Sequence, residues 1–127
     1  MKLEHVALQV ADPAAMADWY VEHLGMRVVR TGDAPGHARF LADSAGASVL
    51  EIYAAPDPPP DYAAMDPLRL HVAFAPDDLG ATRERLLAAG ARAVGEIVVA
   101  PSGDRFAMLR DPWGLALQLA GRARPLL

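Results

Sequence analysis

The sequence predicts an α+β protein made of two βαβββ modules in tandem. The first observation is an internal repeat: Leu3–Leu8 returns as Leu70–Phe74, with His-Val-Ala identical and with His5 and His71 66 positions apart. The second is that each half has one stretch of helical periodicity, flanked by stretches in which apolar and polar residues alternate. Four more pairs recur at offsets of 65 to 67 positions, namely Asp12 and Asp78, Gly25 and Gly90, Arg39 and Arg105, and Glu51 and Gln118. Duplication of a unit of about half the chain explains these coincidences.

The first module, residues 1–54, opens with an alternating strand over Leu3–Val10, whose residues Val6, Leu8 and Val10 share one face. Asp12-Pro13 predicts a helix start, because Asp caps free N–H groups and Pro suits the first helical position. Gly25 predicts the end of that helix. Three strands then follow, over Met26–Thr31, His37–Ala42 and Ser48–Tyr53, separated by Gly, Asp and Pro turns.

The second module, residues 68–120, repeats this order. We expect a strand over Leu68–Phe74 and a helix over Asp78–Ala89, then strands over Arg92–Val99, Arg105–Arg110 and Leu115–Ala120. Residues 55–67 hold five of the 11 prolines and predict a stiff, extended linker. Residues 121–127 form a tail, and the whole of residues 1–127 is expected to make a single domain.

Composition excludes several classes of protein. The chain has 127 residues, 53% of them hydrophobic and 22% charged, as expected of a folded globular protein. There is no Cys, which removes disulfides, thiol nucleophiles and thiolate zinc sites. A net charge of −4 argues against binding nucleic acid. The longest uncharged run, Pro112–Gly121, is too short to span a membrane, and the first residues lack the apolar core of a signal peptide, so we expect a cytoplasmic protein.

Strand alternation places four polar residues opposite the apolar face: His5, Glu51, His71 and Gln118. Several of their neighbours on that face are alanines, which leaves room for a ligand. Taken one at a time, such residues are usually solvated or structural. Two imidazoles, a carboxylate and an amide oxygen at repeat-equivalent positions nevertheless form a plausible set of ligands for a divalent metal ion.

Several features together resemble the vicinal oxygen chelate superfamily, especially its single-domain glyoxalase-like members. They are the paired halves, the opening His5-Val-Ala-Leu, the Leu50-Glu51 strand, the His71-Val-Ala-Phe strand and the Asp111-Pro-Trp-Gly turn before Gln118. The superfamily includes glyoxalase I, methylmalonyl-CoA epimerase, fosfomycin-resistance enzymes, extradiol dioxygenases and bleomycin-resistance proteins. The resemblance covers Leu3 to Ala120 and implies that each module is a half-barrel sheet with its cleft on the concave face.

The resemblance also implies a metal-dependent lyase or isomerase of glyoxalase type. His5, Glu51, His71 and Gln118 would bind a divalent ion, and two neighbouring oxygens of a small carbonyl substrate would chelate it, stabilising an enediolate-like intermediate. Glu51 would be the catalytic base. The implied assembly is a homodimer, with clefts formed between modules and in some cases from both chains. Zn, Ni, Co, Mn and Fe all suit such ligands, and the sequence names neither the metal nor the substrate.

One ligand position departs from the family pattern, because Gln118 stands where glyoxalase-like members usually have Glu. A neutral amide is a weaker ligand and cannot act as a base. A metal-free protein that binds a drug or metabolite, like the bleomycin-resistance proteins, therefore remains an alternative. An extradiol-type dioxygenase is a second alternative, although those enzymes take their carboxylate from the strand that carries Gln118.

Three further residues are weaker candidates for substrate binding. Arg39 and Arg105 are repeat-equivalent and would either clamp an anionic substrate or be solvated at the surface. Tyr53 shares the face of Glu51 and would either line the cleft or simply pack there. Met16, Trp19 and Tyr20 are expected in the core of their helix.

Overall fold

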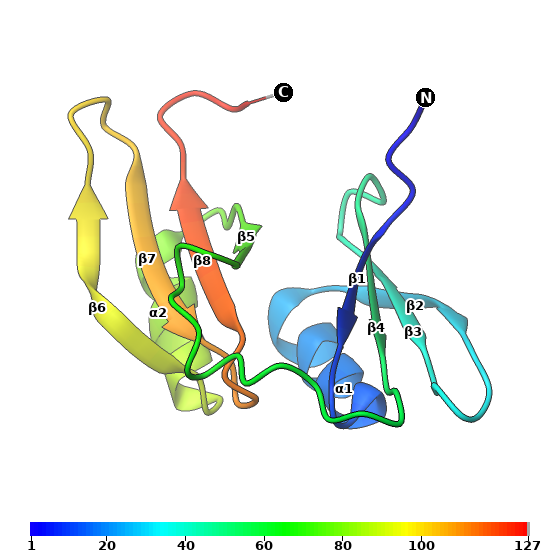
Figure 1. Cartoon of the computed structure of the whole chain (residues 1–127). Coiled ribbons are helices and arrows are strands. Elements are labelled where there is room, and N and C mark those ends of the chain that lie inside the picture. Colours follow the sequence, from blue (N-terminus) through cyan, green and yellow to red (C-terminus); the bar gives the residue numbers. More distant parts are fainter. Residues whose placement is uncertain (127) are drawn as a thin grey trace. The chain divides into compact units, whose positions relative to one another are not determined.

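The computed structural model describes residues 1–126 and confirms the expected α+β architecture of two βαβββ modules (Figure 1). The chain divides into two compact units, with the boundary between Pro60 and Asp61. Each unit contains a four-stranded sheet and one helix. Residues 61–67, expected to belong to the linker, lie within the second unit.

The first unit contains strands β1 (Val6–Gln9), β2 (Arg27–Thr31), β3 (Arg39–Ala42) and β4 (Val49–Tyr53), and helix α1 (Pro13–Leu24). The strand order is β1-β4-β3-β2, with β1 parallel to β4 and the other pairs antiparallel. The helix begins and ends where the sequence predicts. The Asp12 carboxylate accepts a hydrogen bond from Ala15 N at 3.0 Å, and Gly25 ends the helix with a φ of 68°.

The core of the first unit lies between α1 and one face of its sheet. Met16, Tyr20, Leu41 and Ile52 are completely buried there, and Trp19 is 9% exposed, as the helical spacing predicts. Leu8 and Val10 also face this core, but Val6 does not share their burial. Val6, the first residue of β1, is 50% exposed.

The second unit contains strands β5 (Val72–Phe74), β6 (Arg92–Val99), β7 (Arg105–Arg110) and β8 (Ala116–Gly121), and helix α2 (Leu79–Ala88). Its strand order, β5-β8-β7-β6, repeats that of the first unit. The expected strand over Leu68–Phe74 was too long, since regular pairing begins only at Val72. Asp66 turns the preceding segment by accepting hydrogen bonds from Leu68 N and Arg69 N.

Part of the expected linker is folded onto the second unit. The Arg110 guanidinium donates hydrogen bonds to the carbonyl oxygens of Tyr62, Met65 and Gly114, at 2.7–2.9 Å. Tyr62 is 7% exposed. The segment Tyr62–Met65 is therefore a docked turn and not an extended spacer.

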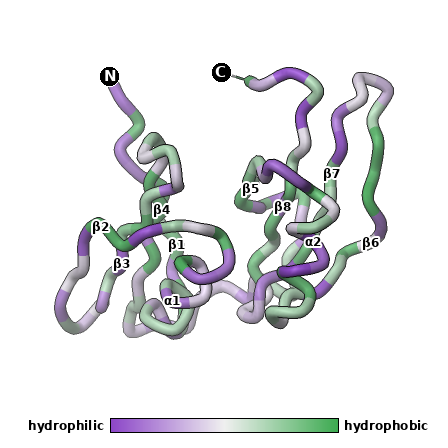
Figure 2. The backbone as a smooth tube through the Cα atoms, turned by 180° about the vertical axis from the view of Figure 1, so that it is seen from behind, coloured by the Kyte–Doolittle hydropathy of each residue, from purple (hydrophilic) through white to green (hydrophobic). Residues whose placement is uncertain are grey.

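The outer strand of the second sheet is unusually apolar for an exposed element. Val98 and Val99 of β6 are 61% and 65% exposed, and much of β6 has the hydrophobic colour in Figure 2. Within residues 1–126, no helix is long and apolar enough to cross a membrane.

Candidate metal-binding half-sites

In the first unit, His5 and Glu51 meet on the sheet face opposite α1. The His5 Nε2 atom lies 3.1 Å from a carboxylate oxygen of Glu51. The register explains this contact: His5 directly precedes Val6, Val6 pairs with Leu50 on the neighbouring parallel strand, and Glu51 follows Leu50. The two side chains are 32% and 19% exposed, so both remain accessible to a ligand.

The other ring nitrogen of His5 is also engaged. Its Nδ1 atom contacts the carboxylate of Glu4, the preceding residue. The His5 ring meets the Phe40 ring edge-on, with centroids 5.7 Å apart. A carboxylate on Nδ1 and an aromatic ring against its side together fix the orientation of the imidazole and leave Nε2 directed at Glu51.

In the second unit, His71 and Gln118 occupy the corresponding places. His71 directly precedes Val72, Val72 pairs with Leu117, and Gln118 follows Leu117. The His71 Nδ1 atom lies 2.9 Å from the carbonyl oxygen of Pro67. Because a backbone carbonyl only accepts, this contact places a hydrogen on Nδ1, so in the neutral imidazole Nε2 is the nitrogen that can bind a ligand.

The two half-sites have the same arrangement of donor atoms, and this arrangement suits a divalent cation. In each, a histidine has its Nδ1 atom held by an oxygen, and a side-chain oxygen comes from the neighbouring parallel strand. Imidazole nitrogen and carboxylate or amide oxygen are ordinary ligands of Zn, Mn and related ions. Within the described residues, no three His, Cys, Asp or Glu side chains gather as a metal group. Each half-site alone thus supplies two donors.

Tyr53 shares the face of Glu51, since it lies two residues along the same strand and pairs with Gln9. Arg39 lies on the other face. It pairs with Ile52, which is buried under α1, and its guanidinium donates to the carbonyl oxygens of His37 and Ala38. Arg39 therefore does not point to the side that carries His5.

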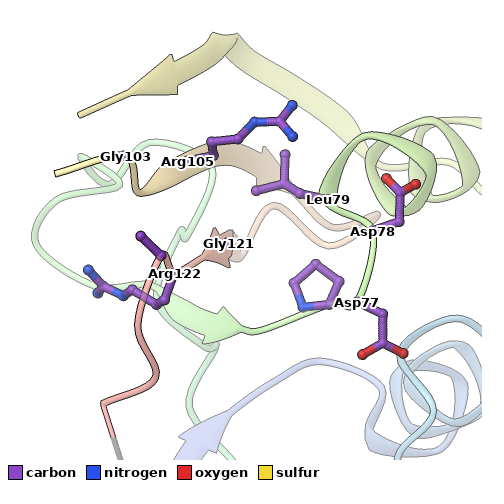
Figure 3. Close-up of a pocket in the computed structure, with 9 residues that line it drawn as sticks. Asp77, Asp78, Leu79, Gly103, Arg105, Gly121 and Arg122 are labelled. Atoms are coloured by element: carbon purple, nitrogen blue, oxygen red, sulfur yellow. The ribbon is translucent and has the colours of Figure 1, made fainter. Parts of the chain in front are cut away.

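Arg105 likewise lies on the helix side of its sheet. It lines a cavity of about 400 Å³ at the start of α2, where Figure 3 shows it and Arg122 across from Asp77 and Asp78. Arg122 is paired with Asp104 at 2.9 Å. This cavity is away from Gln118, because Gln118 pairs with Met108, on the opposite face from Arg105.

Sequence reasoning missed three residues of the first half-site: Glu4, Phe40 and Arg30. Phe40 pairs with Glu51, and the Arg30 guanidinium lies over the Phe40 ring, 5.8 Å from its centroid. In a regular strand, Glu4 and His5 would point to opposite faces, but both precede β1. No pattern in the sequence signals that contact.

Comparison with known proteins agrees with this duplicated fold. A family model described as the Glyoxalase/Bleomycin resistance protein/Dioxygenase superfamily matches residues 2–119. The chain belongs to this superfamily. The resemblance to vicinal oxygen chelate proteins is thereby confirmed at the level of the family. No curated protein matches the chain significantly.

Several solved structures share this fold. SMU.1112c is 30% identical, with a TM-score of 0.73, and the match covers 94% of this chain and 98% of that one. A glyoxalase I mutant from Zea mays is 24% identical, with a TM-score of 0.77, covering 97% of this chain and 46% of the maize chain. FosX, a fosfomycin resistance protein from Listeria monocytogenes complexed with Mn(II) and sulfate, is 15% identical, with a TM-score of 0.73 and coverages of 95% and 90%.

Proposed function

We propose that this superfamily member is a metal-dependent lyase or isomerase of glyoxalase type. The observation that carries the proposal is the 3.1 Å approach of His5 Nε2 and Glu51 on an accessible sheet face. His5, Glu51, His71 and Gln118 are the proposed ligands. FosX, which has the same fold, was crystallised with Mn(II), and this supports a divalent ion as the proposed cofactor here.

A divalent ion held by these residues would polarise two neighbouring substrate oxygens and stabilise the negative charge that develops on them. The chain's own residues then have separable roles. The two histidines orient their Nε2 atoms, through Glu4 for His5 and through Pro67 for His71. The two histidines would use their Nε2 lone pairs on the ion and Gln118 is not basic, so we assign the proton transfer at the carbon beside the carbonyl to the Glu51 carboxylate. Gln118 offers an amide oxygen without charge.

The decisive test is whether Co²⁺ alone binds to protein from which metal has been removed with a chelator. Binding is measured by calorimetry and by the visible absorption of the bound Co²⁺. We expect one ion per chain. His5→Ala and His71→Ala should each weaken binding about 100-fold, since each removes one of four ligands. His37→Asn is the matched control, because His37 is exposed and has a φ of 46°, which Asn tolerates.

Wild-type protein that binds no divalent ion would leave the second candidate, a metal-free binding protein. The neutral Gln118 favours that candidate, because it removes one of the two negative charges that usually hold the ion. Oxygen consumption with catechols in the presence of Fe(II) would instead identify an extradiol-type dioxygenase.

We further propose that the protein acts as a homodimer on a small-molecule substrate. The exposed valines of β6 support this, because apolar surface of this kind is commonly covered by association. Sedimentation analysis at micromolar concentration is expected to give twice the mass of the chain, and a monomer would contradict the proposal.

A further inference from the structure

An arginine, Arg30, lies on the outer strand β2, on the sheet face that carries Glu51. Arg30 of β2 pairs with Phe40 of β3, and Phe40 pairs with Glu51 of β4. Side chains that are paired in this way share one face of a sheet. Glu51, Phe40 and Arg30 therefore form one row across this face of the sheet.

Phe40 contacts both the His5 ring and the Arg30 guanidinium. The His5 ring lies edge-on to it at 5.7 Å between centroids, and the Arg30 guanidinium lies over it at 5.8 Å. A guanidinium that rests on an aromatic ring keeps the N–H donors in its own plane available for another partner. The ring is thus a platform that orients Arg30 without using its hydrogen-bonding capacity.

The Arg30 guanidinium has no hydrogen bond or ion pair within residues 1–126, and its side chain is exposed. Three other arginines of the chain are already engaged. Arg39 and Arg110 donate to backbone carbonyls, and Arg122 is paired with Asp104. Arg27 of the same strand also lies on the face of Glu51 with open donors among the described residues, but of the two only Arg30 rests on an aromatic ring.

We infer that Arg30 binds an anionic group of the substrate, a carboxylate or a phosphoryl group. This inference rests on the proposed metal site, since it assumes that the substrate's oxygens bind beside His5 and Glu51. The backbones of β4 and β2 are about 10 Å apart, two strand spacings. A chain of about three or four carbons plus the reach of an arginine side chain spans that distance. The substrate class is then a short carbonyl compound with neighbouring oxygens at one end and an anion at the other.

Two probes that share a metal-chelating group separate this inference from the metal site itself. Acetohydroxamate presents two neighbouring oxygens and no further charge, whereas the monohydroxamate of succinate adds a carboxylate at the far end. Their dissociation constants would be measured by calorimetry on the Co²⁺-loaded protein. We expect the wild-type protein to bind the carboxylate-bearing probe about tenfold more tightly, as for one charge-assisted hydrogen-bonded pair.

Arg30→Gln should abolish that preference and leave acetohydroxamate binding unchanged, while Arg30→Lys should keep part of it. Arg27→Gln is the matched control. Arg27 lies on the same strand and pairs with Ala42, so it has no aromatic platform, and its loss should preserve the preference. If Arg30→Gln keeps the preference, or Arg27→Gln removes it, the assignment to Arg30 is wrong and the metal site stands. If neither probe binds to the wild-type protein, the proposed function itself fails.

Discussion

The two halves of the molecule place the same histidine at the same point of the same fold, yet they differ in charge. In the first unit, His5 faces the Glu51 carboxylate, and a second carboxylate, that of Glu4, contacts its other nitrogen. In the second unit, the residue matching Glu51 is the neutral Gln118, and His71 is held by the carbonyl of Pro67. One half-site is anionic, and the other is neutral.

The two halves have therefore kept the positions of these side chains while their charges differ. The register that brings a side chain beside each histidine is the same in both sheets, because it depends on backbone pairing. The identity of that side chain is free to change. Among the four proposed ligands only Glu51 carries a negative charge, so that charge lies in the first unit.

The second half-site depends on a docked turn, and breaking that docking should have the largest effect. At Gly114, a Cβ atom would lie 2.8 Å from the Cβ of Ala63, and φ is 90°. Gly114→Ala should therefore lower the free energy of unfolding by about 3 kcal/mol, through the clash and the strained backbone together.

Gly95→Ala is the control for strain alone, because Gly95 has a φ of 73° and open space around it. It should cost about 1 kcal/mol. Chemical unfolding of both variants checks the prediction. Equal losses would show that the Tyr62–Met65 turn does not press on Gly114.

Exchanging the charge between the halves tests whether they are equivalent. Glu51→Gln should weaken Co²⁺ binding about 100-fold, since a carboxylate contributes charge that an amide lacks. Gln118→Glu should strengthen binding about tenfold. The double variant that carries both changes should bind nearly as the wild-type protein does.

Titration calorimetry with Co²⁺ measures all three variants. A double variant as weak as Glu51→Gln alone would mean that Gln118 is outside the coordination sphere.

Much of this fold was predictable, because its determinants are local. Asp12 and Gly25 fixed the limits of α1, and the bounds of β6 and β7 match the expected Arg92–Val99 and Arg105–Arg110. The repeat revealed that the two sheets share one topology. These features depend on capping and alternation within a few residues of one another.

The missed features depend on contacts between distant segments. In the third expected strand, Phe40 and Leu41 are both apolar, so alternation could not tell which of them faces the helix. The structure buries Leu41, which puts Arg39 on the helix side and Phe40 beside Glu51. The linker was misjudged for the same reason, because its turn is fixed by Arg110, which lies more than 40 residues further along the chain.

The charge of Glu4 offers a smaller test of the anionic half-site. Glu4→Gln keeps a hydrogen-bond acceptor near His5 Nδ1 but removes the carboxylate, and it should weaken Co²⁺ binding about tenfold. Glu4→Asp, which keeps the charge, should restore part of the affinity. The visible spectrum of bound Co²⁺ should keep its shape, because the ligands themselves are unchanged. Glu22→Gln is the control, since Glu22 is an exposed carboxylate on α1. If the Glu4 variants bind like the wild-type protein, Glu4 has no positioning role.

The smallest expected effect concerns Asp104, whose carboxylate holds the residues that follow β8. The backbone N–H of Ala123 and then the Arg122 guanidinium hold the pKa of Asp104 below its usual value. Because the folded protein holds this carboxyl in its charged form, the stabilisation is complete above the unfolded pKa of about 3.9 and is lost as pH falls through the lowered folded pKa. Asp104→Asn should therefore unfold at a slightly lower temperature than the wild-type protein at pH 7, and the gap should close in acid. Arg122→Gln removes the second cause and should reproduce part of the change. A gap that is the same at pH 7 and at pH 3 would show that Asp104 stabilises the end of β8 through geometry and not through its charge.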